Sequence, residues 1–445
     1  MNDPVHVIGG GLAGAEAALQ LARFGLPSIL YEMRPQIATA AHKSDRLAEL
    51  VCSNSLKSEQ EFSAPWLLKE ELRRLGSVLI GTVALSARVP GGHALTVDRD
   101  VFAEEVTRAV HSAPLIELRR EEAKTFPHGI VIIATGPLTS QSFAEEIARR
   151  TGESRLFFYD AISPIVEADS VDTSIAFRAS RYGKSLDNSD DYVNCPFTKY
   201  EYEAFVDALL AAESVPAHIP DDQPCWFEAC LPIEELAKRG RDTLRFGPMK
   251  PMGLTDPRTG KRPWAVVQLR QENVRADSFN LVGFQNHMRF PEQARVFRMI
   301  PGLAHAEFVR YGQIHRNTYI NGPALLTPTL QLRTDPRVFF AGQISGVEGY
   351  VESIATGLIA AWHAAELAHG GSPSPFPRQT ALGSLCAYIS GADARNYQPA
   401  NITFDLLPRL DDEAAGRFRH DKRARHAEIC RRALDALTTV SAVPA

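Results

Sequence analysis

The chain has 445 residues, and at about 150 residues per domain this length predicts two or three domains with cores large enough to need no disulfide bonds. Hydrophobic residues make up 44% of the chain and charged residues 23%, which excludes a disordered, collagen-like or coiled-coil protein. The 48 Lys and Arg against 53 Asp and Glu give a formal net charge of -5, which argues against a protein dominated by sequence-independent binding to phosphates.

Cysteine usage and the first residues indicate a reducing compartment. The six cysteines are too few for a disulfide framework, and no C-x-x-C pair occurs. The N-terminus carries no basic region and no signal-peptide cleavage site, and no apolar run reaches about 18 residues. We therefore expect a soluble, cytoplasmic protein without a membrane segment.

A strand, a glycine-rich turn and a helix open the chain. Residues 5–8 form an apolar strand pattern, G-G-G-L-A-G follows at 9–14, and a helical pattern continues to residue 24. Here Gly9 allows the tight turn, Gly11 lets backbone N–H groups approach a pyrophosphate, and Gly14 lets the helix pack closely on the strand. Glu32 ends the next strand, about 20 positions on, where it can accept hydrogen bonds from an adenosine ribose. The predicted contacts to this dinucleotide are Gly9, Gly10, Gly11, Leu12, Ala13, Gly14 and Glu32.

Two later stretches favour FAD over NAD as the dinucleotide. Residues 129–137 form a strand pattern ending in A-T-G-P, which resembles the second FAD-associated motif of flavoproteins with two dinucleotide-binding domains. Residues 338–350 and the small-residue helix at 353–365 resemble the segments that cover the ribityl chain and flavin edge in the glutathione-reductase-like class. That class has Gly-Asp where this chain has Gly342-Gln343, so the contact made by the Asp does not transfer directly.

The distance between these motifs predicts a discontinuous flavin domain. The fold class is therefore α/β, with a Rossmann-like FAD-binding domain of the glutathione-reductase type interrupted by a smaller α+β insertion domain. We expect the first part of the FAD-binding domain at 1–184, the insertion domain at 185–275 and the second part at 276–445. Residues 410–437 read as one amphipathic, basic C-terminal helix. Its cations are Arg417, Arg419, Lys422, Arg423, Arg425, Arg431 and Arg432.

The cysteine spacing does not match a disulfide reductase or a metal site. Cys52 stands alone behind the first βαβ unit, where a redox-active pair would be needed. Cys225 and Cys230 are close, but no second Cys/His cluster completes a tetrahedral site, so we expect no metal.

From end to end, the chain resembles the folate/FAD-dependent tRNA (uracil-5-)-methyltransferases. The larger flavoprotein that modifies the tRNA wobble uridine shares the N-terminal glycines, but it is considerably longer. The matching stretches are 9–18, 31–35, 48–56, 134–140, 158–164, 194–196, 227–234, 246–254, 283–285, 298–303 and 342–357.

This resemblance implies a reaction. A methylene group from 5,10-methylenetetrahydrofolate is placed on C5 of a T-loop uridine in tRNA and reduced to methyl by FAD hydroquinone, with NADH or NADPH as the source of electrons. Addition of a thiolate to C6 of uracil makes C5 nucleophilic. By the family's proposed mechanism Cys230 is this nucleophile and Cys52 is the general base that removes the C5 proton. Ala229 stands where the family has Gly, so a positive φ there would be strained.

The same resemblance suggests further residues. His287 matches a histidine that stacks on the folate pterin against the flavin, and Cys195 and Cys225 are expected to be structural or spectator residues. The flavin end of the cofactor is expected to lie against Gly342, Gln343, Gly349, Tyr350 and Val351. Lys250 and Arg270, with the basic tail, are candidates for contacts with tRNA phosphates.

Two alternatives stay open at this point. The same chemistry on ribosomal RNA would leave the flavin and folate sites alike, and a flavin oxidoreductase acting on a small metabolite would need no RNA surface. An RNA-directed enzyme requires a basic face around the insertion and the tail, which the net charge of -5 can conceal. The oligomeric state does not follow from the sequence.

Overall fold

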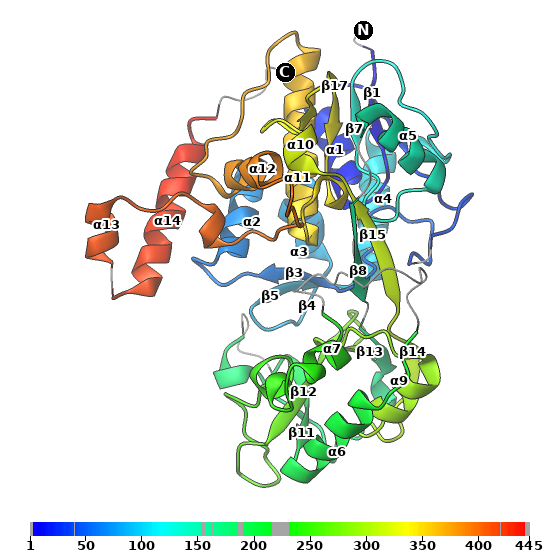
Figure 1. Ribbon diagram of the computed structural model, residues 1–445, viewed down its shortest axis with the longest axis vertical. Coiled ribbons are helices and arrows are strands. Elements are labelled where there is room, and N and C mark those ends of the chain that lie inside the picture. The colour runs from blue at the N-terminus through cyan, green and yellow to red at the C-terminus, as the bar shows by residue number, and fades with distance from the viewer. Residues whose placement is uncertain are drawn as a thin grey trace.

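Two six-stranded sheets organise the chain, each in its own body (Figure 1). The computed structural model describes residues 3–39, 41–152, 156–161, 163–185, 190–215, 231–418 and 420–440, with the backbone alone described at 156–161, 314–316 and 415. None of the helices in these ranges is long and apolar enough to cross a membrane.

The first sheet has the order β16-β17-β7-β1-β2-β6. All neighbours pair in parallel except β16, which is antiparallel to β17. The central strands are apolar and buried on both faces, as a sheet covered by helices on both sides requires. Its strands are β1 (Val5–Ile8), β2 (Ser28–Tyr31), β6 (Ile116–Arg119), β7 (Val131–Ile133), β16 (Gln331–Leu332) and β17 (Asp335–Phe340).

Helices cover this sheet, and two of them meet at backbone distance. A Cβ atom on Gly357 would lie 2.3 Å from the carbonyl oxygen of Ala13, so only glycine permits this approach. These two residues lie in α11 and α1. The helices of this body are α1 (Leu12–Arg23), α2 (Ala64–Arg74), α3 (Ala84–Ser86), α4 (Arg99–Ser112), α5 (Gln141–Thr151), α10 (Gly322–Leu325), α11 (Tyr350–Ala368), α12 (Ala381–Gly391), α13 (Asp412–Arg417) and α14 (Lys422–Leu437).

A small antiparallel sheet lies at the edge of the first body that faces the second (Figure 1). Its strand order is β3-β5-β4, and its strands are β3 (Ser55–Ser58), β4 (Arg88–Val89) and β5 (Ala94–Val97). Because β3 begins three residues after Cys52, this sheet fixes the chain just beyond the cysteine.

The second body contains the other six-stranded sheet, with the order β10-β11-β12-β13-β9-β14 and antiparallel pairing throughout. It has its own apolar core, built around Phe205, Phe284 and Phe297. Its elements are β9 (Ile165–Glu167), β10 (Phe177–Arg178), β11 (Tyr192–Phe197), α6 (Lys199–Leu210), α7 (Ile233–Lys238), α8 (Thr243–Phe246), β12 (Ala265–Gln271), β13 (Ser278–Leu281), α9 (Phe290–Phe297) and β14 (Phe308–Arg310).

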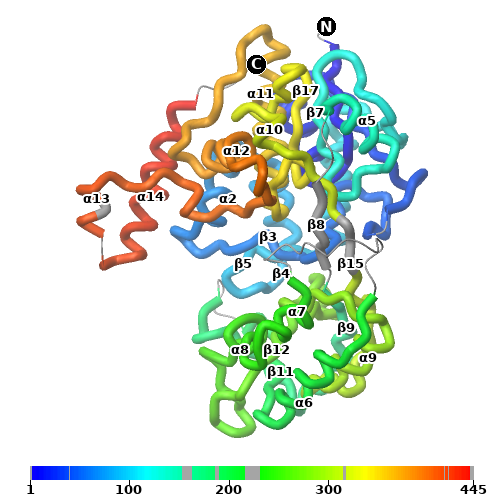
Figure 2. The backbone as a smooth tube through the Cα atoms, viewed as in Figure 1, coloured from blue at the N-terminus to red at the C-terminus, as the bar shows by residue number. Residues whose placement is uncertain are grey.

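Two long strands join the two bodies (Figure 1), and Figure 2 shows the second body as the green part of the chain. The crossing strands, β8 (Leu156–Ala161) and β15 (Ile314–Tyr319), pair with each other antiparallel. The fold class is confirmed, but the predicted insertion domain, 185–275, is too short at both ends. The second sheet takes in residues 165–310, because β9 pairs with β13 and β14, which come more than a hundred residues later.

The C-terminal segment forms two helices, α13 and α14, where one helix at 410–437 was predicted. The carboxylate of Asp421 accepts a hydrogen bond from the amide of Ala424 and so caps the start of α14. The apolar face of α14, which includes Ile429, Cys430 and Ala433, packs into the first core.

Candidate functional site

A cleft opens at the carboxyl ends of β1, β2, β7 and β17, where parallel α/β sheets bind their ligands. It holds about 1030 Å³ of space not filled by protein, open solvent at its mouth included. Nine of the predicted cofactor contacts line it: Gly9, Gly10, Gly11, Leu12, Ala13, Glu32, Gly342, Gln343 and Tyr350.

The three glycines of the opening motif differ in what surrounds them. Gly9 has φ +108, and a Cβ there would lie 2.5 Å from the carbonyl oxygen of Ala134. A Cβ on Gly14 would lie 1.8 Å from the carbonyl oxygen of Gly9, so this position holds helix and strand together. On Gly11, by contrast, a Cβ would meet nothing within 4 Å. Gly11 therefore borders open space in the cleft, as a residue against which a ligand packs should.

The amino-terminal end of α1 is free for an anion. Gly11 is its N-cap residue and provides no side-chain capping bond, and the first turn contains no acidic residue. The unsatisfied N–H groups and the helix dipole favour a negative group at such an end. A pyrophosphate is the group that fits this part of the cleft.

Glu32 is 5% exposed and is held in a fixed orientation. Its Oε2 accepts a hydrogen bond from the amide of Gly10 at 3.1 Å, and its Oε1 accepts from Nε of Arg34 at 2.9 Å. Burial raises the pKa of Glu32, but the hydrogen bonds and charge of Arg34 outweigh it, so the net shift is downward. The carboxylate is therefore charged and faces the cleft as an acceptor for ribose hydroxyls.

The second motif and the Gly342-Gln343 turn complete the cleft. Residues 134–140 line it beside β7, as the A-T-G-P pattern predicted. Gln343 occupies the position of the usual Asp, and its Nε2 donates to Glu348 Oε2 at 2.5 Å. This bond turns the amide nitrogen away and leaves the amide oxygen as the group that can accept from a ligand hydroxyl.

Cys52 is not among the residues that line the cleft, but its neighbour Val51 and its hydrogen-bond partner Tyr350 are. Its amide donates to Tyr350 Oη at 2.8 Å, and the amide of Ser53 donates to the same oxygen at 3.1 Å. Burial raises the pKa of Tyr350 well above its ordinary value, so the phenol stays neutral. The thiol itself is half-buried.

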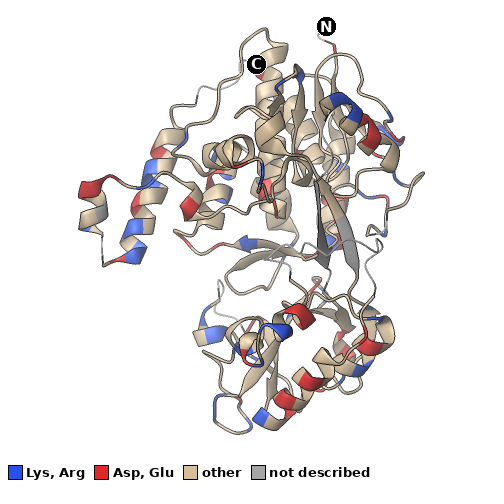
Figure 3. Ribbon diagram, in the orientation of Figure 1, with Lys and Arg blue, Asp and Glu red and all other residues tan. Residues whose placement is uncertain are grey.

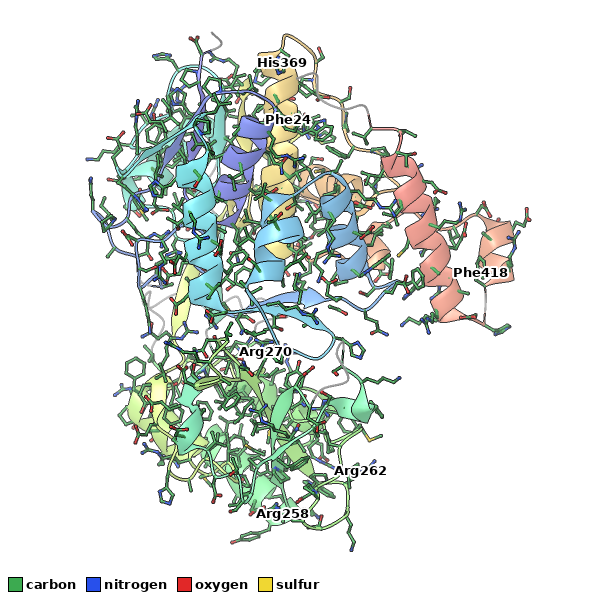
Figure 4. All side chains as sticks on the ribbon, turned by 180° about the vertical axis from the view of Figure 1, so that it is seen from behind. Phe24, Arg258, Arg262, Arg270, His369 and Phe418 are labelled. Carbon is green, nitrogen blue, oxygen red and sulfur yellow. The ribbon has the colours of Figure 1, made fainter. Side chains whose placement is uncertain are left out.

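Three arginines surround the segment that carries Cys52, and we call Arg99, Arg270 and Arg310 the arginine cluster. Arg99 donates to the carbonyl oxygen of Leu50 at 2.9 Å, Arg310 to that of Val51 at 3.1 Å, and Arg270 to Ser53 Oγ at 2.8 Å. The cluster joins the two bodies, because Arg99 comes from the first and the other two from the second. Figure 4 shows Arg270 at this junction.

The remaining predicted site residues lie elsewhere or outside the described ranges. Val351 is buried in the first turn of α11, and Gly349 precedes that helix with φ +111. His287 does not line the cleft: it lies between β13 and α9, with Nδ1 2.6 Å from Glu234 Oε1 and its amide donating to the same oxygen at 2.7 Å. Cys230, Cys225 and Ala229 fall outside the described residues.

The other cysteines described are buried and unreactive. Burial raises the pKa of Cys195, Cys386 and Cys430 to about 12 in each case, with nearby carboxylates adding to the effect at Cys430. Within the described ranges, no three His, Cys, Asp or Glu side chains are grouped to hold a metal ion.

Some of the cations predicted to contact RNA are buried or paired with carboxylates, and others are exposed. Arg270 is 8% exposed and donates to Ser53 Oγ. It is therefore not a surface cation, as the predicted contact with tRNA phosphates would require. In the tail, Arg417 and Arg431 pair with acidic neighbours, and Figure 3 shows both signs alternating along α14. Lys422, Arg423 and Arg425 are exposed, with no acidic partner within 4 Å among the residues described.

Sequence reasoning missed three residues of this region. Arg34 fixes Glu32 and also reaches Glu49 at 3.3 Å; its only signal was its place in the matching stretch 31–35. Arg99 and Arg310 lie in no matching stretch, and nothing in their spacing relates them to Cys52.

Comparisons with known proteins agree with this geometry. The family described as "Glucose inhibited division protein A" matches residues 4–372. The protein named methylenetetrahydrofolate--tRNA-(uracil-5-)-methyltransferase TrmFO from Solibacter usitatus is 71% identical over 438 residues, which cover 98% of each chain. The protein of the same name from Koribacter versatilis is 60% identical over 436 residues, covering 98% of this chain and 97% of its own.

A solved structure shares the fold. GidA of Aquifex aeolicus in its form II crystal superposes with a TM-score of 0.68 at 16% identity, covering 98% of this chain and 74% of that chain. At this identity the likeness shows the fold alone. The identities of the two relatives and the family match show more: the chain belongs to the glucose inhibited division protein A family and, within it, to the TrmFO group of methylenetetrahydrofolate--tRNA-(uracil-5-)-methyltransferases.

Proposed function

We propose that this protein methylates C5 of a uridine in the T loop of tRNA, taking the one-carbon unit from 5,10-methylenetetrahydrofolate and electrons from NADH or NADPH. The observation that carries the proposal is the 71% identity, over 98% of both chains, to a relative whose name states methylenetetrahydrofolate, tRNA and methylation at position 5 of uracil. The T loop and the nicotinamide reductant rest on the family resemblance. Such a substrate is found in the cytoplasm, where we place the protein.

FAD fits the residues of the cleft. The open space over Gly11, the uncapped end of α1 and the charged Glu32 suit a pyrophosphate and an adenosine ribose. Gln343 and Tyr350 stand where the ribityl chain and flavin of the same molecule would end. FAD, once reduced, supplies the hydride that converts the transferred methylene group to methyl.

The protein's part of the chemistry falls to two thiols. Cys230 adds as thiolate to C6 of uracil, the electron pair moves onto C5, and C5 bonds to the one-carbon unit of the folate. Cys52 takes the proton that C5 must lose, and the bond between the one-carbon unit and the folate nitrogen then breaks, so that tetrahydrofolate leaves and a methylene group remains on C5. The Cys230 thiolate leaves as this methylene group takes up hydride and becomes methyl. The support for Cys52 is its place beside Tyr350 at the flavin end of the cleft; the role of Cys230 rests on the family motif.

His287 is proposed to contact the folate pterin. Its contacts with Glu234 fix the ring close to α7, and the amide of Ile233 at the start of α7 donates to the carbonyl oxygen of Gln285 at 2.8 Å. The start of α7, three residues after Cys230 in the sequence, is thus tied directly to the loop between β13 and α9 that carries His287.

The RNA is proposed to meet exposed cations. Lys422, Arg423 and Arg425 on α14 and Lys250 on the second body are exposed, and none has an acidic partner within 4 Å among the residues described. Exposed cations of this kind contribute most of the sequence-independent affinity for nucleic acid, and that affinity falls as salt rises.

The test is a transfer assay with the flavin-loaded protein, NADPH, unmodified tRNA and methylenetetrahydrofolate labelled on its one-carbon unit. The proposal expects label in 5-methyluridine of the T loop after digestion to nucleosides. A tRNA whose T-loop uridine is replaced by cytidine serves as the matched control and should acquire none.

Two further arms separate the alternatives. Transfer to a ribosomal RNA fragment but not to tRNA would replace the substrate and keep the chemistry. A gel-shift assay with a T-arm minihelix that showed no binding, together with no transfer to either RNA, would exclude an RNA-directed enzyme.

A further inference from the structure

The segment 50–53 is held from every side by side chains of distant elements. Arg99 at the start of α4 bonds Leu50, Arg310 in β14 bonds Val51, and Arg270 in β12 bonds Ser53. Tyr350 accepts from the amides of Cys52 and Ser53. Three of these four side chains carry a positive charge, although neutral donors would bind the same carbonyl and hydroxyl oxygens.

The carboxylates at this place are too few to balance the arginines. Glu272 pairs with Arg99 through two hydrogen bonds, at 2.6 and 3.2 Å. Neither Arg270 nor Arg310 has a carboxylate within 4 Å among the residues described. Buried cations are rare unless an anion accompanies them. The positive charges of Arg270 and Arg310 therefore call for a negatively charged group close to them.

The nitrogen atoms left unsatisfied belong to these two arginines. Nε of Arg270 and Nε and Nη2 of Arg310 are buried and donate to no acceptor among the described residues. In Arg310 these two atoms form the edge of the guanidinium that binds an anion side-on. Arg270 is 8% exposed, so water cannot replace the missing anion freely.

Among the residues that the structure describes around segment 50–53, Cys52 is the remaining one that can become an anion. The charged or titratable groups that interact with it are Arg99 from α4, Arg270 from β12, Arg310 from β14 and Tyr350 from α11. Lys43, Glu49 and Glu272 are the next groups out: Lys43 interacts with Arg99, Arg310 and Glu49, and Glu272 with all three arginines. Glu49 is already engaged by Arg34 at 3.3 Å, and the phenol of Tyr350 stays neutral.

We propose that Arg270 and Arg310 are positioning residues that hold Cys52 as a thiolate, so that the proposed general base is charged before substrate binds. This inference rests on the role proposed for Cys52. A thiolate is the basic and nucleophilic form of cysteine, and nearby cations stabilise it over the thiol.

The protonation of the arginines agrees with this arrangement. Burial and, after it, repulsion from Arg99 lower the pKa of Arg310 to about 10, although Glu272 and Cys52 oppose both effects. Burial likewise lowers the pKa of Arg270. Arg99 shows the opposite net shift, because Glu272 outweighs its burial. The two arginines without a carboxylate are thus the ones destabilised as cations, and a charged Cys52 would relieve both.

The experiment measures the acidity of Cys52 directly, without RNA or folate. Flavin-loaded protein is treated with iodoacetamide at a series of pH values, and mass spectrometry follows the peptide that contains Cys52, so the other cysteines do not interfere. The proposal expects alkylation to titrate at a pH below that of an unperturbed thiol, about 8.5. Titration at or above that value in the wild-type protein overturns it, whatever the variants do.

Variants then assign the effect. Arg310→Gln, which keeps hydrogen-bonding capacity but removes charge, should slow alkylation of Cys52 at neutral pH by about tenfold, and Arg310→Lys should restore most of the rate. Arg337→Gln, at an exposed arginine paired with Asp335, is the matched control and should change nothing. An unchanged Cys52 titration in folded, flavin-bound Arg310→Gln overturns the proposal. Because no methyl transfer is measured, the result stands apart from success or failure of the transfer assay.

Discussion

The amide of Cys52 donates a hydrogen bond to Tyr350 Oη at 2.8 Å, across 298 residues of sequence. Tyr350 begins α11 and lines the cleft next to Gln343. The position of the cysteine is therefore set by α11, the helix that borders the flavin end of the cleft. A group bound at that end is held at a fixed position relative to the thiol.

Replacement of Tyr350 by Phe tests this connection. The change keeps the ring but removes the oxygen that accepts from two amides, and unpaired buried amides cost about 1–3 kcal/mol. We expect flavin to be retained, because the ring remains, and methyl transfer to fall by about tenfold. Steady-state transfer with a flavin absorbance spectrum for each preparation measures both.

The matched control is Tyr388→Phe, which removes a hydroxyl that donates to the carbonyl oxygen of Gln398 at an exposed site. It should leave transfer unchanged. Wild-type transfer by Tyr350→Phe would show that the two amides do not need this acceptor.

Glu71 predicts how stability depends on pH. Its buried carboxylate accepts from the amides of Ala381 and Leu382 at the start of α12, yet burial raises its pKa to about 8 against an ordinary value of 4.5. Between these two values the folded protein holds a proton that the unfolded chain has released. Stability should therefore fall as pH rises across this window, by at most about 1.4 kcal/mol per pH unit for this one group.

Thermal unfolding followed by circular dichroism from pH 5 to 8 checks this expectation. Glu71→Gln imitates the protonated side chain, so its melting temperature should vary less with pH than that of the wild type. Glu70→Gln, one residue earlier on the same helix and paired with Arg74, should keep the wild-type slope. Equal slopes in all three proteins would contradict the assignment to Glu71.

The sequence was sufficient for features that lie within one short stretch. The strand, glycine turn, helix and terminal Glu32 of the first βαβ unit depend on neighbours in the chain, and each glycine has the surroundings that its role requires. The A-T-G-P segment and Gly342-Gln343, which were also found from local patterns, line the same cleft.

Features made by distant segments were not predictable. The extent of the insertion depends on β9 pairing with β13 and β14, and no local pattern announces a partner so far along the chain. The arginine cluster converges from α4, β12 and β14, so Arg99 and Arg310 carried no signal, and Arg270 was mistaken for a surface cation.

Glu32 provides a test of cofactor binding. Glu32→Gln removes the charge that Arg34 and the ribose hydroxyls share, and it turns an amide N–H toward donors. Hydrogen bonds to charged groups contribute about 1.5–3 kcal/mol, so we expect the dissociation constant for FAD to rise by at least about tenfold. Titration of the flavin-free protein by quenching of FAD fluorescence measures it.

Glu117→Gln is the control for Glu32, since that carboxylate pairs with Arg119 on the exposed edge strand β6. It should bind FAD as the wild type does. An unchanged dissociation constant for Glu32→Gln would mean that the carboxylate serves only to orient Arg34.

Gly11 and Gly14 separate a ligand-contacting glycine from a packing glycine. Gly11→Ala adds a Cβ where nothing lies within 4 Å, at a φ of -76 that alanine adopts without strain, so the flavin-free protein should be as stable as wild type or gain up to about 1 kcal/mol. FAD affinity should nevertheless fall, because the methyl group takes the space of the pyrophosphate.

Gly14→Ala should instead lower the melting temperature of the flavin-free protein, since its Cβ would lie 1.8 Å from the carbonyl oxygen of Gly9. Gly81→Ala, another glycine with nothing within 4 Å but remote from the cleft, controls for the added methyl group. Equal FAD affinity in Gly11→Ala and Gly81→Ala would place the pyrophosphate elsewhere and remove the basis for reading the end of α1 as its binding site.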